Sequence, residues 1–265
     1  MILAGDSSKS GLCGAILATP GRIGANTTAQ TPPECPVLSS SLAVLSGATI
    51  VFDLDGTLID TAPDLIATLN VLLGEEGIAA LPLASARNMI GRGARALIAR
   101  GFEAAGAPAD SATLDRLFDR FIAHYRDNIA LHSRPFPSMI ETLDALHAAG
   151  ARLAVCTNKR TDLSVALLDA LNLTSRFAAI VGADAAPAAK PDPRHLTLTI
   201  DRAGGRIDRA VMVGDSASDL GAARAAGVPV VLVSFGYSDI PARELEADVL
   251  IDHYDQLLDG CVALL

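Results

Sequence analysis

One stretch decides the fold, Thr49-Ile50-Val51-Phe52-Asp53-Leu54-Asp55-Gly56-Thr57. Its first four residues are apolar or β-branched, which is typical of a buried strand, and the Asp-Gly pair then marks a turn. Further along, Thr61 and Asp64 have the spacing of a capping box, with Pro63 in the first turn of the helix that would follow. The stretch therefore predicts a buried strand, an acidic loop and then a helix.

Outward from this stretch, the chain divides into a helical segment and an alternating one. From 64 to 132 every strong apolar period is helical. After residue 132, helical patterns alternate with β-branched runs at 153–156, 179–181, 210–213 and 230–233. This alternation predicts an α/β fold with a doubly wound parallel sheet. The helical segment is then an insertion that follows the first strand.

These patterns predict three parts. The catalytic core would comprise 47–63 and 133–265, and the all-helical cap 64–132. Residues 1–46 are rich in small and polar residues and show no sustained period, so we expect a loosely ordered extension. Asp6 and Lys9 interrupt its start, which argues against a signal peptide.

Composition excludes several classes of protein. The 265 residues are 50% hydrophobic and carry a net charge of −9, so the chain is neither disordered nor marked by the overall basic charge of many nucleic-acid-binding proteins. No apolar run approaches the ~18 residues that a membrane span needs. The four cysteines lack C-x-x-C spacing, so a zinc site is unsupported and the reducing cytoplasm is the expected location. None of the five histidines has ligand spacing, and structural or surface roles are expected for them.

Polar residues follow each predicted strand, and ligands of open α/β sheets bind at the carboxyl ends of the strands. Taken singly, these residues have ordinary explanations: Thr157 could cap a helix, Asp219 could favour a helix N-terminus, and Lys190 could be a solvated loop charge. The residues in question are Asp53, Asp55, Thr157, Asn158, Lys159, Lys190, Asp215 and Asp219.

Taken together, these residues predict a cation site. Asp53, Asp55 and Asp215 would repel one another at a strand-end crevice unless a cation neutralised them. An all-oxygen ligand set suits Mg²⁺, which binds one or two carboxylates together with substrate phosphate. The lysines of the chain are Lys9, Lys159 and Lys190, so two of them lie just beyond strand ends. A compact ammonium suits a point contact to phosphate or to an aspartyl carboxylate.

The motifs resemble those of the haloacid dehalogenase-like hydrolases. Residues 53–57 are similar to the first motif of that family, Thr157-Asn158 to the second, Lys190 to the third and Gly214-Asp215 to the fourth. The resemblance covers 48 to about 257, and the helical insertion resembles the cap of the family's first type.

This resemblance implies a mechanism. Asp53 would be the nucleophile that forms an aspartyl-phosphate, and Asp55 the general acid and base. Mg²⁺ would be held by Asp53, the main-chain carbonyl of Asp55 and Asp215, with Asp219 orienting the metal shell. The expected phosphate-binding residues are Gly56, Thr57, Thr157, Asn158 and Lys190. Because a dehalogenase needs no acid two residues after its nucleophile, Asp55 favours phosphoryl chemistry.

Closer resemblance is to the phosphoglycolate phosphatase branch, which implies hydrolysis of 2-phosphoglycolate. It is carried by Asp60-Thr61-Ala62-Pro63-Asp64, Ile90-Gly91-Arg92-Gly93-Ala94, Thr157-Asn158-Lys159, Lys190-Pro191-Asp192-Pro193 and Phe235-Gly236-Tyr237. The chain departs from the branch at Ser138 and Ala183, which stand where glycine is usual and put the fine geometry of the site in question. We expect Ser138 to cap the following helix.

The substrate assignment leaves alternatives open. The cap has no lysine, which excludes the Schiff base of phosphonate-cleaving members. Arg92 is a candidate for a bidentate contact to the carboxylate of phosphoglycolate, although Arg92 and Arg95 could equally form a solvated helix face. The competing functions are a phosphatase for a sugar phosphate or pyrophosphate, a phosphosugar mutase, and a non-catalytic binding module. The expected partner is a small phosphorylated metabolite, with no nucleic acid or membrane, and the expected state is a monomer or homodimer.

Overall fold

The structure, a computed structural model, describes residues 42–265. Most of the predicted extension 1–46 lies outside the described residues. Its last residues do not match the prediction, because Ala43–Leu45 forms a 3-10 helix (η1) and Leu45 is fully buried in the core. The ordered part of the chain therefore begins before the predicted boundary at residue 47.

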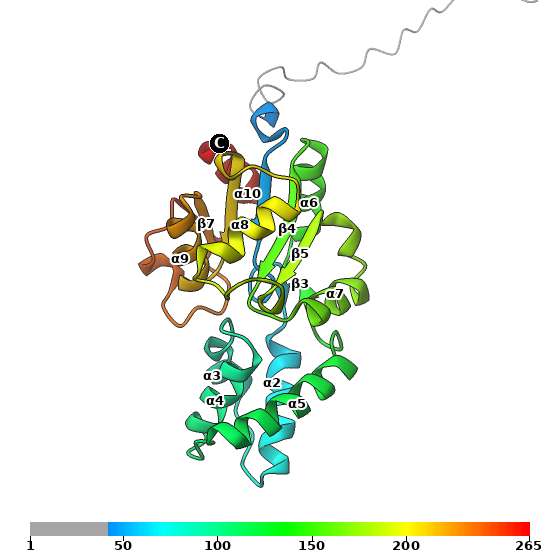
Figure 1. Cartoon of the computed structure of the whole chain (residues 1–265), viewed down its shortest axis with the longest axis vertical. Coiled ribbons are helices and arrows are strands. Elements are labelled where there is room, and N and C mark those ends of the chain that lie inside the picture. Colours follow the sequence, from blue (N-terminus) through cyan, green and yellow to red (C-terminus); the bar gives the residue numbers. More distant parts are fainter. Residues whose placement is uncertain (1–41) are drawn as a thin grey trace, which may run out of the picture. The chain divides into compact units, whose positions relative to one another are not determined.

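The core is a six-stranded parallel sheet, as the alternating pattern predicts (Figure 1). The strands are β1 (Thr49–Phe52), β4 (Arg152–Thr157), β5 (Ala179–Gly182), β6 (Ala210–Gly214), β7 (Val230–Val233) and β8 (Val249–Ile251). Their order is β5-β4-β1-β6-β7-β8, so the first strand lies at the centre between β4 and β6. The sequence analysis did not predict β8, which is only three residues long.

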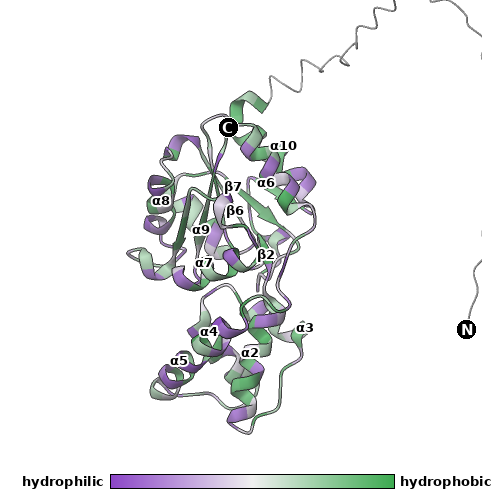
Figure 2. Ribbon diagram, turned by 90° about the vertical axis from the view of Figure 1, so that its right-hand side faces the viewer, coloured by the Kyte–Doolittle hydropathy of each residue, from purple (hydrophilic) through white to green (hydrophobic). Residues whose placement is uncertain are grey.

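Helices cover both faces of the sheet, and successive strand residues serve opposite faces (Figure 2). Ile50 and Phe52 pack into one apolar cluster, whereas Val51 packs into the other. The first cluster receives α6 (Met139–Ala148), α7 (Thr161–Ala170) and α10 (Leu257–Leu264), and the second receives α8 (Pro193–Arg202) and α9 (Ala217–Ala226). This two-sided burial explains why the strands are almost continuously apolar.

All the regular elements of the inserted segment are helices, as its 3.6-residue apolar period predicts. Its elements are α2 (Ala62–Glu75), α3 (Leu83–Ala86), η2 (Arg87–Met89), α4 (Ala94–Ala104) and α5 (Ser111–Asp127). They share an apolar cluster that includes Leu69, Ile98 and Phe121. The two chain segments that join the insertion to the core pair as a short antiparallel ladder, β2 (Ile59–Asp60) with β3 (Arg134–Pro135), which the sequence analysis did not predict.

Short 3-10 turns complete the described chain. They are η3 (Thr174–Arg176), η4 (Ala183–Ala185), η5 (Ile207–Arg209), η6 (Ala242–Glu244) and η7 (Tyr254–Gln256). Across 42–265, the structure contains no helix with the length and apolar character that crossing a bilayer requires.

The predicted capping box at the start of α2 is wrong. Thr61 is the N-cap residue but makes no side-chain capping bond, and its hydroxyl donates to Asp55 instead (2.7 Å). Asp64 accepts hydrogen bonds from the backbone of His132 and from both the backbone and the hydroxyl of Ser133. Donors of the other connecting segment engage Asp64, and the Asp55 carboxylate engages Thr61, so neither side chain makes the local hydrogen bond that the spacing predicts.

The predicted cap at Ser138 is also wrong. Ser138 precedes α6, but its side chain makes no capping bond, and its φ is +58°. This left-handed conformation carries no steric penalty for glycine, which agrees with the glycine that the resembling branch has there. An N-cap side chain reaches the helix backbone from an extended φ and ψ, so the left-handed backbone removes the cap.

His195 is a fully buried histidine in the first turn of α8. Its Nε2 lies 3.1 Å from the carbonyl oxygen of Val181, so Nε2 carries the hydrogen of the neutral ring. Within 42–265, Nδ1 finds no hydrogen-bond partner. Burial, together with the positive charge of Lys190, lowers the pKa of His195 from 6.5 to about 4.

This histidine predicts a loss of stability in acid. Between pH 6.5 and about 4 the unfolded chain binds a proton at His195 and the folded chain does not, so the free energy of unfolding falls as the pH falls. The full effect is about 3 kcal/mol. Urea denaturation over this range should show a shallower decline for His195→Gln than for the unsubstituted protein. His147→Gln, at an exposed position, is the control and should leave the decline unchanged; an equal decline in the His195→Gln variant would contradict the prediction.

Candidate active site

Three buried carboxylates meet at the carboxyl edge of the sheet. Asp53 follows β1, Asp215 follows the adjacent β6, and Asp219 lies in the first turn of α9. One carboxylate oxygen from each lies within 4.8 Å of the others. The structure therefore brings Asp53, Asp215 and Asp219 together at the sheet edge where the strand placement predicts them.

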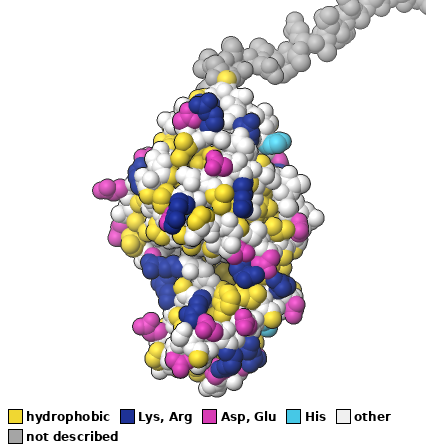
Figure 3. All heavy atoms as spheres, viewed as in Figure 1, with side chains coloured by type: hydrophobic (Ala, Val, Ile, Leu, Met, Phe, Trp, Pro, Cys, Tyr) yellow, Lys and Arg dark blue, Asp and Glu magenta, His cyan; other side chains and the backbone are white. Residues whose placement is uncertain are grey.

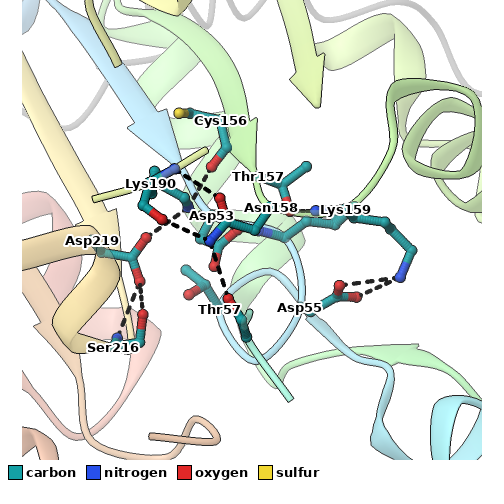
Figure 4. A network of polar contacts seen from close by, with 12 residues as sticks. Asp53, Asp55, Thr57, Cys156, Thr157, Asn158, Lys159, Lys190, Ser216 and Asp219 are labelled. Carbon is teal, nitrogen blue, oxygen red and sulfur yellow. Dashed lines mark hydrogen bonds and ion pairs between the residues drawn. The ribbon is translucent and has the colours of Figure 1, made fainter. Parts of the chain in front are cut away.

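Lys190 lies among these acids. Its Nζ is 3.0 Å from Oδ1 of Asp53 and 2.7 Å from Oδ1 of Asp219, and it donates to the carbonyl of Cys156 at 2.6 Å (Figure 4). Only 1% of the Lys190 side chain is exposed. Burial opposes its charge, but Asp219 and Asp53 outweigh burial and raise the pKa of Lys190 above its ordinary value. The interpretation of Lys190 as a solvated loop charge is therefore excluded.

The nucleophile candidate Asp53 is difficult to ionise. Burial raises its pKa to about 6, and Lys190 opposes that rise while Asp219 and Asp55 add to it. The backbone N–H of Leu54 donates to Oδ1 of Asp53 at 2.7 Å, which also favours the anion. One ammonium therefore does not balance the negative charge at this edge of the sheet.

Asp215 is in a similar environment. Burial, together with Asp219 and Asp53, raises its pKa well above the ordinary value, although two donors oppose this. These donors are the backbone N–H of Tyr237 (2.7 Å) and the hydroxyl of Thr57 (3.0 Å). A bound cation would relieve the same repulsion.

Glycine is required at position 56 for close approach. Gly56 has φ +83°, and a Cβ there would lie 2.6 Å from Oδ2 of Asp215 and 2.9 Å from the Tyr237 ring. Thr57, an expected phosphate ligand, is fully buried and engages Asp215 with its hydroxyl. Thr57 thus holds Asp215 in place and Gly56 leaves room for it, and neither residue lines the cavity described below.

Asp55 is held by two side chains. Its two oxygens accept from Nζ of Lys159 at 2.9 and 3.1 Å, and the Thr61 hydroxyl donates to it at 2.7 Å. Nζ of Lys159 also lies 4.6 Å from the ring centre of Tyr125 in α5. The sequence analysis noted Lys159 as a lysine beyond a strand end but did not assign it to the site. It assigned no role to Tyr125, whose helical spacing alone indicates a core residue.

Thr157 ends β4 and Asn158 follows it, and the hydrogen bonds of both side chains stay within the loops around the site. The Thr157 hydroxyl accepts from the backbone of Lys159 at 3.2 Å. The Asn158 amide donates to the carbonyls of Gly91 and Lys190 and accepts from the Lys190 backbone. Thr157 does not cap α7, because Arg160 is the N-cap residue. Asn158 thus ties the Lys190 loop to the inserted segment, and a phosphate contact by either residue stays a prediction.

Asp219 both caps a helix and contacts other residues of the candidate site. With Ser216 it forms a capping box at the start of α9, and its Oδ2 also accepts from the backbone N–H of Asp215. Its other oxygen contacts Lys190. Asp219 is therefore a helix-capping residue that also positions Asp215 and Lys190.

Tyr237 is a buried contact between the core and the inserted segment that the sequence analysis left without a role. Its hydroxyl donates to Asp60 and accepts from the backbone N–H of Ala62 at 3.1 Å. The guanidinium of Arg87 lies over its ring at 4.9 Å and contacts Asp60 at 3.2 Å. Only the tertiary structure reveals this arrangement, because its members are distant in sequence.

A cavity of about 340 Å³ lies between these loops and the inserted helices. Its polar lining includes Asp53, Asp55, Thr157, Asn158 and Lys159, and its apolar lining includes Leu65, Phe121 and Leu163. In Figure 3, hydrophobic side chains gather on the inserted segment near the sheet domain, with charged side chains around them. Arg92 lies on the cavity wall, but its guanidinium contacts Asp239 at 3.1 Å, and 60% of its side chain is exposed. Its predicted contact to a substrate carboxylate stays a prediction.

Comparison with known proteins decides the family. A family model described as haloacid dehalogenase-like hydrolase matches residues 50–233. This range includes the motifs that follow β1, β4, β5 and β6, but not Thr49 or the segments beyond β7. The chain belongs to the haloacid dehalogenase-like hydrolase family. The family assignment agrees with the parallel sheet and with the order of the acidic and basic residues along its edge.

Several relatives in this family share most of the chain. A phosphoglycolate phosphatase of Caulobacter vibrioides is 54% identical over 226 residues, covering 85% of this chain and 95% of that protein. One of Mesorhizobium japonicum is 50% identical, covering 80% and 94%. Among solved structures, a predicted phosphoglycolate phosphatase from Haemophilus somnus has a TM-score of 0.75 at 30% identity, covering 82% of this chain and 98% of the other. A predicted phosphatase from Clostridium acetobutylicum has a TM-score of 0.72 at 22% identity, covering 83% and 100%, and shares the fold.

Proposed function

We propose that this hydrolase cleaves 2-phosphoglycolate to glycolate and inorganic phosphate through an aspartyl-phosphate on Asp53, with Mg²⁺ as cofactor. The relatives that are 54% and 50% identical carry the name phosphoglycolate phosphatase, which supports the substrate. The observation that carries the reaction class is the buried group of Asp53, Asp215, Asp219 and Lys190, of which Asp53 lines the cavity.

The donor set fits Mg²⁺. Asp53, Asp215 and Asp219 offer only carboxylate oxygens, and their negative charge exceeds that of the one ammonium, Lys190, that the described residues place among them. Burial raises the pKa of both Asp53 and Asp215, so a cation would stabilise their anionic forms. The main-chain carbonyl of Asp55 stays the predicted further ligand. When bound, Mg²⁺ would neutralise charge that develops on the phosphoryl oxygens.

The residues of the chain then have the following roles. The contacts from Leu54 and Lys190 both fall on Oδ1 of Asp53, so we assign the attack on phosphorus to Oδ2. As the new O–P bond forms, the ester O–P bond breaks and Asp55 gives its proton to the leaving glycolate oxygen. In the second step Asp55 takes a proton from water, the water oxygen bonds to phosphorus, and the bond to Asp53 breaks to release phosphate. Lys190, Thr157 and Asn158 are the proposed phosphoryl contacts.

A panel of substrates tests the proposal. We expect kcat/KM to be highest for 2-phosphoglycolate among that ester, glucose 6-phosphate and pyrophosphate. Chelation of Mg²⁺ should lower turnover on the order of 10³-fold, and added Mg²⁺ should restore it, because metal stabilisation of the transition state amounts to several kcal/mol. A higher kcat/KM for another ester would overturn the substrate, and turnover that survives chelation would overturn the cofactor. The cytoplasmic location and the monomeric or dimeric state stay predictions.

A further inference from the structure

The cavity wall carries more positive charge than phosphoryl transfer at Asp53 requires. Among the described residues, its cations are Arg92, Arg95, Lys159 and Arg160. The three arginines pair with acids near the surface, and 60%, 45% and 44% of their side chains are exposed, respectively. Only 6% of the Lys159 side chain is exposed. Lys159 is therefore the wall cation whose charge is buried.

Lys159 and Lys190 serve different parts of the site. Lys190 contacts Asp53, whereas Lys159 extends away from Asp53 to Asp55 (Figure 4). Asp55 is the residue proposed to protonate the leaving group. The Lys159 ammonium, which contacts Asp55, therefore lies beside the space that the leaving group of the substrate must occupy. An ester that is anionic at both ends would meet one ammonium at its phosphoryl end and the other at its opposite end.

The surroundings of Lys159 suit a small anion. Leu65, Phe121 and Leu163 give the cavity an apolar lining, which strengthens the attraction between an ammonium and a carboxylate. Tyr125 adds a second donor. Its side chain is fully buried and lines the same cavity, and within 42–265 its hydroxyl finds no acceptor. The nearby Lys159 ammonium can only donate to it, so the hydroxyl hydrogen is available to a ligand.

We propose that Lys159, assisted by the Tyr125 hydroxyl, binds the carboxylate of the substrate and so selects short phosphate esters of hydroxy acids. The proposal rests on the proposed function, since it concerns the leaving group of the same reaction. On binding, the substrate carboxylate accepts from Nζ of Lys159, which then shares its donors between that carboxylate and Asp55. Lys159 is thus a specificity-determining residue that also positions the acid and base.

The test compares 2-phosphoglycolate with ethyl phosphate, which lacks the carboxylate. Lys159→Met keeps an unbranched side chain that is one atom shorter and removes its charge. Because Lys159 also touches Asp55, its loss should slow both substrates, but the ratio of the two kcat/KM values should fall by about 10²-fold. Tyr125→Phe should lower the same ratio by about 3- to 10-fold through the KM for 2-phosphoglycolate. The Tyr125→Phe variant keeps the test decisive if Lys159→Met does not fold.

Two arginine variants complete the test. Arg95→Met removes a wall cation that Asp115 already engages, so the substrate ratio should not change. Arg92→Met tests the rival carboxylate contact. The proposal would be overturned if the ratio of the two kcat/KM values fell in Arg92→Met but not in Lys159→Met. It would also be overturned if Lys159→Met lowered kcat/KM equally for both substrates and Tyr125→Phe left the ratio unchanged. An unsubstituted enzyme with no preference for 2-phosphoglycolate over ethyl phosphate would instead overturn the proposed substrate.

Discussion

Asp53→Asn should lower kcat for phosphate-ester hydrolysis on the order of 10⁴-fold or more, because removal of a covalent nucleophile has effects of that size. The amide nitrogen and oxygen of asparagine cannot replace the carboxylate oxygen that forms the bond to phosphorus. Release of inorganic phosphate from 2-phosphoglycolate measures the effect. In parallel, mass spectrometry of acid-quenched protein should detect a phosphoryl group on Asp53 only in the unsubstituted enzyme.

The matched control for this experiment is Asp208→Asn. Asp208 is an exposed carboxylate that pairs with Arg206 at the surface, so its replacement should leave kcat within about two-fold. Near-normal turnover by a correctly folded Asp53→Asn protein would exclude Asp53 as the nucleophile. A protein that acts only by binding small phosphates would keep that function in Asp53→Asn.

The second large effect is on stability. Lys190→Met should lower the free energy of unfolding by about 3–5 kcal/mol without Mg²⁺, which is the usual result of removing one partner of a buried ion pair. The change leaves the Asp53 and Asp219 carboxylates without the ammonium that they contact at 3.0 and 2.7 Å. Urea denaturation followed by circular dichroism measures the loss. Added Mg²⁺ should reduce it, because a ligand that binds only the folded state stabilises that state.

Two comparisons separate this effect from a general loss of charge. Arg206→Met removes a cation whose side chain is 76% exposed and should change stability by no more than about 0.5 kcal/mol. Addition of Asp219→Asn to Lys190→Met should recover part of the loss, since one of the unpaired acids is then neutral. A Lys190→Met protein as stable as the unsubstituted one would show that other groups neutralise these acids.

The fold was largely predictable because its main elements follow from local periods. The strands β1, β4, β5, β6 and β7 and the helices of the insertion appear where alternation and 3.6-residue spacing place them. The β2–β3 ladder could not be predicted, since Ile59–Asp60 and Arg134–Pro135 pair across the whole insertion. The caps expected at Thr61 and Ser138 failed because the Asp55 carboxylate and a left-handed backbone, respectively, replaced the local hydrogen bond.

The site was predictable where residues directly follow strands. Asp53, Asp215 and Lys190 meet because parallel strands bring their carboxyl ends to one edge. The contacts of Asp55 and Lys159 were not predictable, since Lys159 reaches Asp55 from the loop after β4, and Tyr125, which lies against Lys159, comes from α5 of the insertion.

The sequence by itself determined the parallel sheet, the helical insertion and the motifs at the strand ends. Hydrophobic period and loop position are local properties, which is why they can be read along the chain. The tertiary structure alone decided which charges are buried together. It placed Lys190 between Asp53 and Asp219 and Lys159 against Asp55. The strength of a charge pair depends on its separation and on the loss of water around it, and both arise only when distant segments pack.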